Sequence, residues 1–127
     1  MTRDEIDAWA NAYISVQENS EVVSPDNPLW WALERFMPGS PIRRANAEDC
    51  WLAILEILVR EPPPKILSLL AAGPLEDLID DYGPEFIERI ETESRRNPSF
   101  RRLLGGVWQS STPEIWARIQ SAQGQRW

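Results

Sequence analysis

Four carboxylates within six residues are the side chains of this sequence whose types and spacing come closest to a chemical site. They stand in the run PLEDLIDDYG as Glu76, Asp77, Asp80 and Asp81. In a helix, Glu76 lies one turn from Asp80, and Asp77 one turn from Asp81, opposite the leucines and the isoleucine of the run. Like charges at this spacing destabilise a helix by a few tenths of a kcal/mol per pair, and no base in the run relieves them. A positively charged ligand would therefore be favoured here.

Three interpretations of these carboxylates stay open. The simplest is a solvated acidic face without a ligand. The second is a docking surface for a protein with a basic surface. The third is a Mg²⁺ or Ca²⁺ site made by Asp77, Asp81 and a neighbour such as Glu85, since both ions prefer carboxylate oxygens. We adopt the docking surface as the functional hypothesis, with Glu76, Asp77, Asp80 and Asp81 as partner-binding residues.

Apart from these carboxylates, the chain contains few of the residues and motifs that catalysis usually requires. It contains no histidine, which removes the most common general base and most zinc ligands. Its one cysteine, Cys50, stands beside Trp51 at the start of an apolar run, where a thiol is most often a small core residue. No phosphate-binding pattern of the G-x-x-x-x-G-K type occurs. We therefore expect no catalytic residue, no metal and no cofactor, and predict that the protein is not an enzyme.

Charge is distributed unevenly along the chain. The net charge is −7, yet residues 1–93 carry 19 acids and 7 bases, whereas residues 94–127 carry 1 acid and 6 bases. The overall negative charge argues against a general affinity for nucleic acid. The cluster of Arg95, Arg96, Arg101 and Arg102 has two interpretations: contacts to phosphate, or cations that stabilise the C-terminal ends of two helices. On the sixth expected helix, Glu91 and Arg95 have the spacing of a favourable pair.

Tryptophan is unusually frequent, with seven residues in the chain. Helical spacing predicts that Trp9, Trp30, Trp51 and Trp116 lie in the core. Trp31 aligns with Arg35 on another side of its helix, so it is the candidate aromatic anchor of an interface. Trp108 follows two glycines and is expected to fill the gap between the last two helices, whereas Trp127 has no predicted place.

The segments that position these residues have helical signals throughout, and the fold class predicted is all-α, with about eight short helices. Two expected joints, Gly73-Pro74 and Gly83-Pro84, would turn the chain sharply, because glycine permits positive φ and proline restarts a helix. The apolar segment near residues 47–60 is expected to be the central helix, with residues 51–59 most buried. The expected helices start at Thr2, Asn27-Pro28, Asn46, Lys65, Pro74, Pro84, Pro98 and Thr112-Pro113.

The 127 residues fit one domain, 1–127, with orthogonal or solenoid-like packing of short helices. The N-terminal residues lack the basic and apolar regions of a secretory signal. No apolar run approaches the roughly 18 residues that span a membrane. We therefore expect a cytoplasmic protein without a membrane partner.

Three segments carry a resemblance to a known family. GPLEDLI, EFIERIE and PSFRRLLGGVW together resemble a small bacterial family that is a domain of unknown function. The resemblance covers about forty residues, the stretch of chain that contains these segments, and implies a single helical bacterial domain. It implies no activity, ligand or site residue.

The sequence thus predicts a small acidic cytoplasmic protein-binding module, such as an immunity-type inhibitor of a toxin or of another basic partner. Trp31 and the four carboxylates are its expected binding residues. Two alternatives stay open: a minor enzyme or metal-binding domain that uses the carboxylates, and an accessory subunit that contacts nucleic acid through the arginine cluster. The sequence is also compatible with a homo-oligomer.

Overall fold

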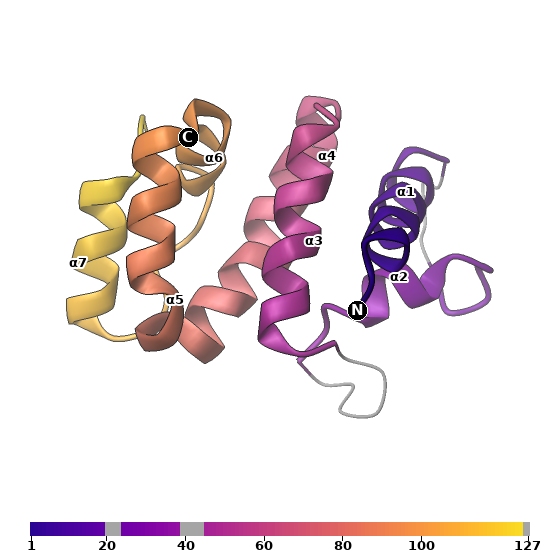
Figure 1. Ribbon diagram of the computed structural model, residues 1–127, viewed down its shortest axis with the longest axis horizontal. Coiled ribbons are helices and arrows are strands. Elements are labelled where there is room, and N and C mark those ends of the chain that lie inside the picture. Colours follow the sequence, from indigo (N-terminus) through magenta and orange to yellow (C-terminus); the bar gives the residue numbers. More distant parts are fainter. Residues whose placement is uncertain (20–23, 39–44, 126–127) are drawn as a thin grey trace. The chain divides into compact units, whose positions relative to one another are not determined.

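The computed structural model describes residues 1–19, 24–38 and 45–125. These residues form helices joined by turns and contain no strand, so the predicted all-α class is confirmed (Figure 1). None of their helices is both long enough and apolar enough to cross a membrane. The elements are α1 (Arg3–Asn19), α2 (Trp30–Glu34), α3 (Ala47–Val59), α4 (Pro64–Leu70), the π-helical segment η1 (Ala71–Leu75), α5 (Glu76–Arg96), α6 (Pro98–Leu104) and α7 (Pro113–Ala122).

Contacts between residues divide the chain into two compact units, Met1–Ile66 and Leu67–Trp127. In the N-terminal unit, α1 packs against α2 and α3. In the C-terminal unit, α5 packs against η1, α6 and α7. The expectation of a single domain over residues 1–127 stays a prediction.

The start of α1 has the capping box that Thr2-x-x-Glu5 predicts. The Thr2 N–H donates to Glu5 Oε1, and the Glu5 N–H donates to Thr2 Oγ1, both at 3.1 Å. These hydrogen bonds favour the ionised carboxylate and lower the pKa of Glu5. The helix then buries Ile6, Trp9 and Tyr13 at helical spacing, as expected.

An aromatic cluster joins α1 to the region of α2. Trp9 is fully buried, and its Nε1–H donates to the backbone oxygen of Ala32 at 2.8 Å. The Phe36 ring lies 4.4 Å from the Trp9 ring and 5.5 Å from the Tyr13 ring, the latter edge-on. Burial raises the pKa of Tyr13 to about 12. The cluster holds the N-terminal unit together through one specific hydrogen bond within an apolar core.

Helix α3 is only partly covered, which corrects one prediction. Asn46 caps it by accepting from the Asp49 N–H at 2.8 Å, and Ile54 and Ile57 are fully buried. However, Leu52 is 42% exposed and Val59 70% exposed, so the expectation that the whole segment 51–59 is the most buried one holds only for one side of the helix. The helix carries more apolar residues than its buried side accommodates.

An ion-pair network attaches the other end of α3 to α1. Arg60 donates to the backbone oxygen of Asp7 at 3.2 Å and to the Asn11 side chain, and it contacts the Asp7 and Glu56 carboxylates at 3.3 and 3.2 Å. Arg3 contacts the same two carboxylates, at 3.3 and 2.7 Å respectively. Shared partners of this kind orient two helices more firmly than isolated surface pairs do.

The two Gly-Pro joints have different outcomes. Gly73 and Pro74 lie inside η1, so the helix end predicted at Gly73 is wrong. At Gly83-Pro84 the predicted turn is confirmed: Tyr82, directly before it, has a non-helical φ of −134° and ψ of 21°, and α5 consists of two helical parts that meet at this kink (Figure 1). The predicted reason was wrong, because no glycine of the described residues has a positive φ. Proline lacks an N–H and crowds the preceding turn, which accounts for a widened turn at the first joint and a kink at the second.

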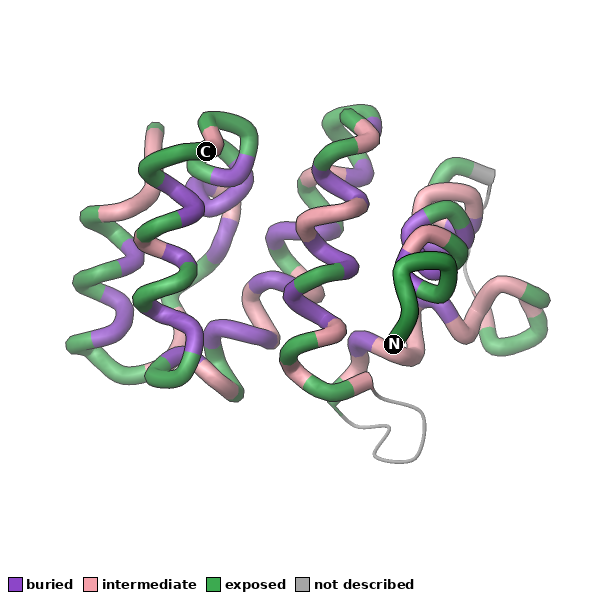
Figure 2. The backbone as a smooth tube through the Cα atoms, in the orientation of Figure 1, coloured by how far each residue is buried: buried purple, intermediate pink, exposed green. Residues whose placement is uncertain are grey.

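The remaining helices of the C-terminal unit begin where the sequence predicts. Asn97 caps α6 by accepting from the Phe100 N–H at 3.2 Å, and Thr112 caps α7 by accepting from the Ile115 N–H at 3.3 Å. Buried residues recur along α5 and α7 at helical intervals (Figure 2). The outer sides of both helices are left to polar and charged residues, including the acidic start and the basic end of α5.

Candidate binding surfaces of the C-terminal unit

The first surface is the acidic start of α5, defined as Glu76, Asp77, Asp80 and Asp81. Glu76 Oε1 accepts from the Trp108 N–H at 3.0 Å, and Asp80 Oδ1 accepts from the Ser111 N–H at 3.1 Å. The sequence missed both bonds because their partners lie about thirty positions further along the chain. Glu76 and Asp80 are therefore not unpaired, although neither of these donors is a base. Their negative charge persists, because a backbone N–H is neutral and a carboxylate has other lone pairs.

The remaining two carboxylates share the same helical segment. Asp77 is half-buried and Asp81 is exposed, and each interacts with another group of the protein. Among the described residues, no three Asp, Glu or Cys side chains are placed to hold a metal ion together. The structure thus offers no support for the alternative of a metal site at Asp77, Asp81 and Glu85.

Trp108 is the functional candidate that sequence reasoning misplaced. It was expected to fill a gap between helices, but Trp108 is 69% exposed, and the preceding Val107 is buried instead. The turn at residues 105–106 brings Val107 inward, and the hydrogen bond to Glu76 fixes the Trp108 backbone. An exposed tryptophan on a fixed backbone beside carboxylates is an arrangement suited to a protein interface.

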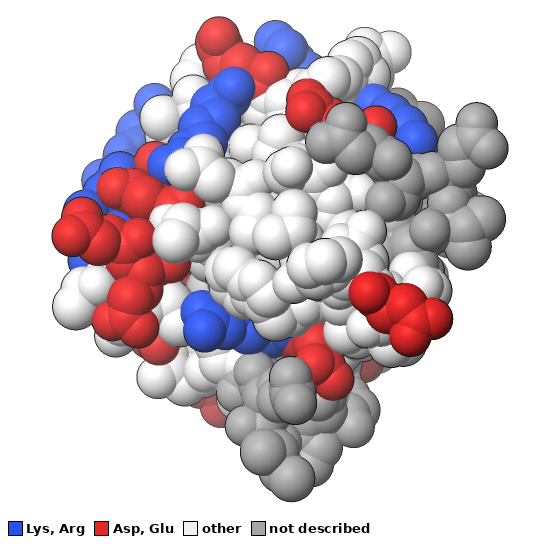
Figure 3. Space-filling view, turned by 90° about the vertical axis from the view of Figure 1, so that its right-hand side faces the viewer, with Lys and Arg blue, Asp and Glu red and all other residues white. Residues whose placement is uncertain are grey.

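Trp31, the anchor candidate from the sequence, belongs to α2 in the N-terminal unit. It is half-buried, and the Arg35 guanidinium lies 4.7 Å from its ring centroid, so the expected alignment with Arg35 is confirmed. The side of the molecule with α1 and α2 shows a broad uncharged area bordered by charged side chains (Figure 3). The four carboxylates belong to the C-terminal unit, so Trp31 and the acidic start of α5 are separate features, each within its own unit.

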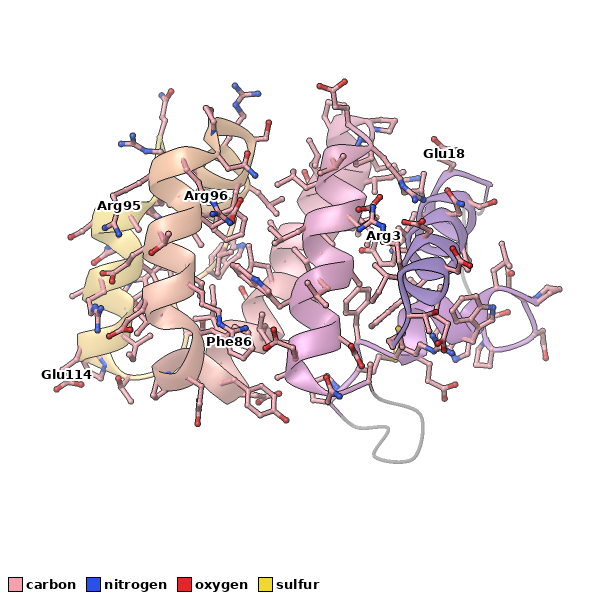
Figure 4. The ribbon with its side chains drawn as sticks, viewed as in Figure 1. Arg3, Glu18, Phe86, Arg95, Arg96 and Glu114 are labelled. Carbon is pink, nitrogen blue, oxygen red and sulfur yellow. The ribbon has the colours of Figure 1, made fainter. Side chains whose placement is uncertain are left out.

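The second surface is the basic end of α5. Arg95 and Arg96 leave the helix on opposite sides, with Arg95 toward α7 (Figure 4). Arg96 contacts Glu93 Oε1 through Nε at 3.0 Å and Nη2 at 2.6 Å, and Asn97 Nδ2 donates to Glu93 Oε2 at 2.9 Å. Glu93 is buried, so its charge is compensated as a buried carboxylate requires. Of the two adjacent arginines, Arg96 therefore has a structural role.

Arg95 faces a pocket of about 300 Å³ between α5, α6 and α7. Arg101 lines its other side. Ser94 donates its hydroxyl to the backbone oxygen of Ala122, which ties α5 to the end of α7. The lining residues are Glu91, Ser94, Arg95, Arg101, Ser121 and Ala122.

The pairing of Glu91 differs from the sequence prediction. Arg118 of α7 makes two hydrogen bonds to the Glu91 carboxylate, one from Nε at 3.0 Å, while Arg95 donates to Thr92 Oγ1 at 3.3 Å. The contact with Arg118 lowers the pKa of Glu91 and raises that of Arg118. A bidentate contact with a neighbouring helix thus replaces the expected pair within α5.

Cys50 lies in the core of the N-terminal unit, as the sequence predicts. It is buried, with Sγ 3.7 Å from the backbone oxygen of Ala45 and 3.9 Å from that of Arg35. A thiol that is enclosed and bonded to backbone carbonyls serves as a small core residue.

The helices and surfaces described above are those of an all-α protein whose C-terminal unit carries both an acidic and a basic surface. The chain belongs to DUF6869, a family of unknown function, which matches residues 18–127. The matched range includes the segments that carry the resemblance to a domain of unknown function. No curated protein and no solved structure matches the chain.

Proposed function

We propose that this protein is a protein-binding module whose partner has a basic surface, with Trp108 and the acidic start of α5 as the binding site. The proposal includes the finer expectations from the sequence: a bacterial, cytoplasmic protein that acts as an immunity-type inhibitor. The exposed side chain of Trp108 is the single observation that carries the proposal.

Exposure of Trp108 has an energetic consequence. Tryptophan is among the residues that contribute most to protein interfaces, and a large exposed aromatic ring gains free energy when a partner covers it. The Glu76 carboxylate fixes the backbone of Trp108, so less conformational entropy is lost on binding. Trp108 is therefore a better anchor than the half-buried Trp31, which already lies against Arg35.

Charge defines the kind of partner. Four carboxylates lie in and beside the first turn of α5, and two of them position the segment that carries Trp108. A partner that presents lysine or arginine around an apolar pocket would match both the charge and the ring. Such complementarity accelerates association and disfavours acidic proteins as partners.

A comparative capture experiment tests the proposal. The 127-residue chain and its W108A variant are immobilised and exposed to a lysate of the native host at low salt. We expect wild-type protein to retain a basic protein that W108A loses. V59A is the matched control, because Val59 is exposed to the same degree but belongs to the N-terminal unit. W31A tests the anchor that the sequence suggested.

Two outcomes would contradict the proposal. In one, no protein is retained, or the same proteins are retained by wild type, W108A and V59A. In the other, W31A loses the partner and W108A keeps it, which would move the site to the N-terminal unit. A toxin gene beside the gene for this protein would supply the candidate partner for a direct assay with purified components.

A further inference from the structure

We propose that the pocket lined by Arg95 and Arg101 binds a small oxyanion, namely the phosphate group of a small phosphorylated compound. This site is separate from the protein interface proposed above. It uses two arginines from different helices, α5 and α6, that the rest of the structure does not require as ion-pair partners. The sequence shows the arginine cluster, and the structure selects which of its members face one cavity.

The donors of the pocket are available. Arg101 makes no side-chain hydrogen bond or ion pair within the described part of the chain. Arg95 makes one hydrogen bond, from Nη2 to Thr92 Oγ1, and a guanidinium has five N–H donors. Arg95 and Arg101 both line this cavity, and two guanidinium groups match the charge and the several acceptor oxygens of a phosphate.

Glu91, the one acid among the described lining residues, does not cancel this positive charge. Glu91 is held by two hydrogen bonds from Arg118, so the pocket keeps the charges of Arg95 and Arg101. The hydroxyl groups of Ser94 and Ser121 donate to the backbone oxygens of Ala122 and Ala117. The Ser94 bond joins α5 to the end of α7, whereas the Ser121 bond lies within α7, and the arginines supply the charge of the pocket.

Size and composition restrict the ligand. A volume of about 300 Å³ is at the lower end of small-molecule sites, which favours a compact compound over a polymer. The described lining residues include no aromatic ring on which a base could stack, and the net charge of −7 disfavours nucleic acid. A phosphate carries more negative charge than a carboxylate and is favoured by two arginines.

Titration of the full chain with inorganic phosphate tests this inference. Isothermal calorimetry is run at constant ionic strength, balanced with chloride, with acetate as a second probe. We expect saturable binding of phosphate and weaker binding of acetate. Equal binding of both probes would keep the oxyanion site but contradict the assignment to phosphate.

Matched variants connect the binding to the pocket. R101Q should weaken phosphate binding by about ten-fold or more, since it removes a charge-assisted hydrogen bond. R102Q removes the same charge from the next position but does not line the pocket, so it should change the affinity by less than about two-fold. R95Q provides the second pocket variant if R101Q is not folded by circular dichroism. Absence of saturable phosphate binding, or equal loss in R101Q and R102Q, would overturn the inference.

Discussion

At the start of α5, Glu76 and Asp80 accept hydrogen bonds from the backbone of the segment that carries Trp108, whereas at its end Arg95 faces a pocket that it shares with Arg101. Both ends are clusters of like charge in the sequence. The acidic side chains act partly within the molecule, where they fix a loop and present an aromatic ring. The basic side chains of the pocket leave most of their donors open to a ligand.

The comparison shows that a cluster of like charges in the sequence does not tell how many of those side chains remain available to a binding partner. What matters is which neutral or charged group each side chain meets after the helices pack. At the basic end, Arg96 is bound to the buried Glu93 and Arg118 to Glu91, while the neighbouring Arg101 has no such partner among the described residues. The arginines of this region therefore divide into members that pair with a carboxylate of the protein and members that line the pocket.

The largest effect on stability is expected for a substitution at Gly105, where the loop that carries Trp108 begins. A Cβ at this position would lie 2.4 Å from the backbone oxygen of Gln125 and 3.3 Å from that of Arg102. Because backbone atoms cannot move away easily, Gly105→Ala should lower the free energy of unfolding by about 1–3 kcal/mol. Urea denaturation followed by circular dichroism measures the change.

Gly73 is the matched control for this substitution. A Cβ there meets nothing within 4 Å, and the residue lies in the π-helical segment. Gly73→Ala should therefore leave stability unchanged or raise it by about 0.5–1 kcal/mol. Equal destabilisation by both substitutions would mean that contact with Gln125 is not what restricts Gly105.

The next effect concerns the two loop-binding carboxylates. Glu76→Ala and Asp80→Ala each remove an acceptor for a backbone N–H and should cost about 1 kcal/mol each. The double substitution D77N/D81N removes like charges and should change stability by less than about 0.5 kcal/mol. Thermal unfolding of the variants in one buffer compares them. If D77N/D81N were more destabilising than Glu76→Ala and Asp80→Ala, it would be wrong to assign the stabilising contacts mainly to Glu76 and Asp80.

The smallest expected effect is a pH dependence of the stability that the Glu91–Arg118 pair contributes near the basic end of α5. Arg118 lowers the pKa of Glu91 in the folded protein below its ordinary value of 4.5. The contribution to stability is therefore fully present above about pH 4.5 and is lost as the pH falls through the lowered pKa. Because the pair is exposed to solvent, which screens the charges, the contribution should be small. The difference in stability between wild type and Glu91→Gln should thus shrink on acidification, and a constant difference would contradict the assigned pairing.

The sequence was informative where a feature depends on neighbours along the chain. The capping box at Thr2 and Glu5, the caps at Asn46 and Asn97 and the burial of Trp9 are all local or periodic signals, and the structure confirms them. The bend at Gly83-Pro84 was predicted for the wrong reason: a Cβ at Gly83 would lie 2.7 Å from Ser111 Oγ, so glycine permits close approach rather than positive φ.

The candidate sites depended on contacts between distant positions, and the sequence could not supply these. Nothing near Trp108 in the chain indicates that Glu76 fixes its backbone and leaves its ring exposed. Likewise, the helical spacing of Glu91 and Arg95 does not indicate that Glu91 pairs with Arg118, because that contact forms only when α7 packs against α5. The charge clusters were identifiable from residue types, but their use depends on tertiary packing.

The rate of association with the captured basic partner tests the central claim most directly. Wild type, D77N/D81N and W108A are compared by surface plasmon resonance at low and high ionic strength. We predict that D77N/D81N slows association at low salt and removes part of its salt dependence, whereas W108A mainly accelerates dissociation. An association rate that neither D77N/D81N nor salt changes, together with an unchanged dissociation rate in W108A, would contradict the proposal that this surface binds a protein partner.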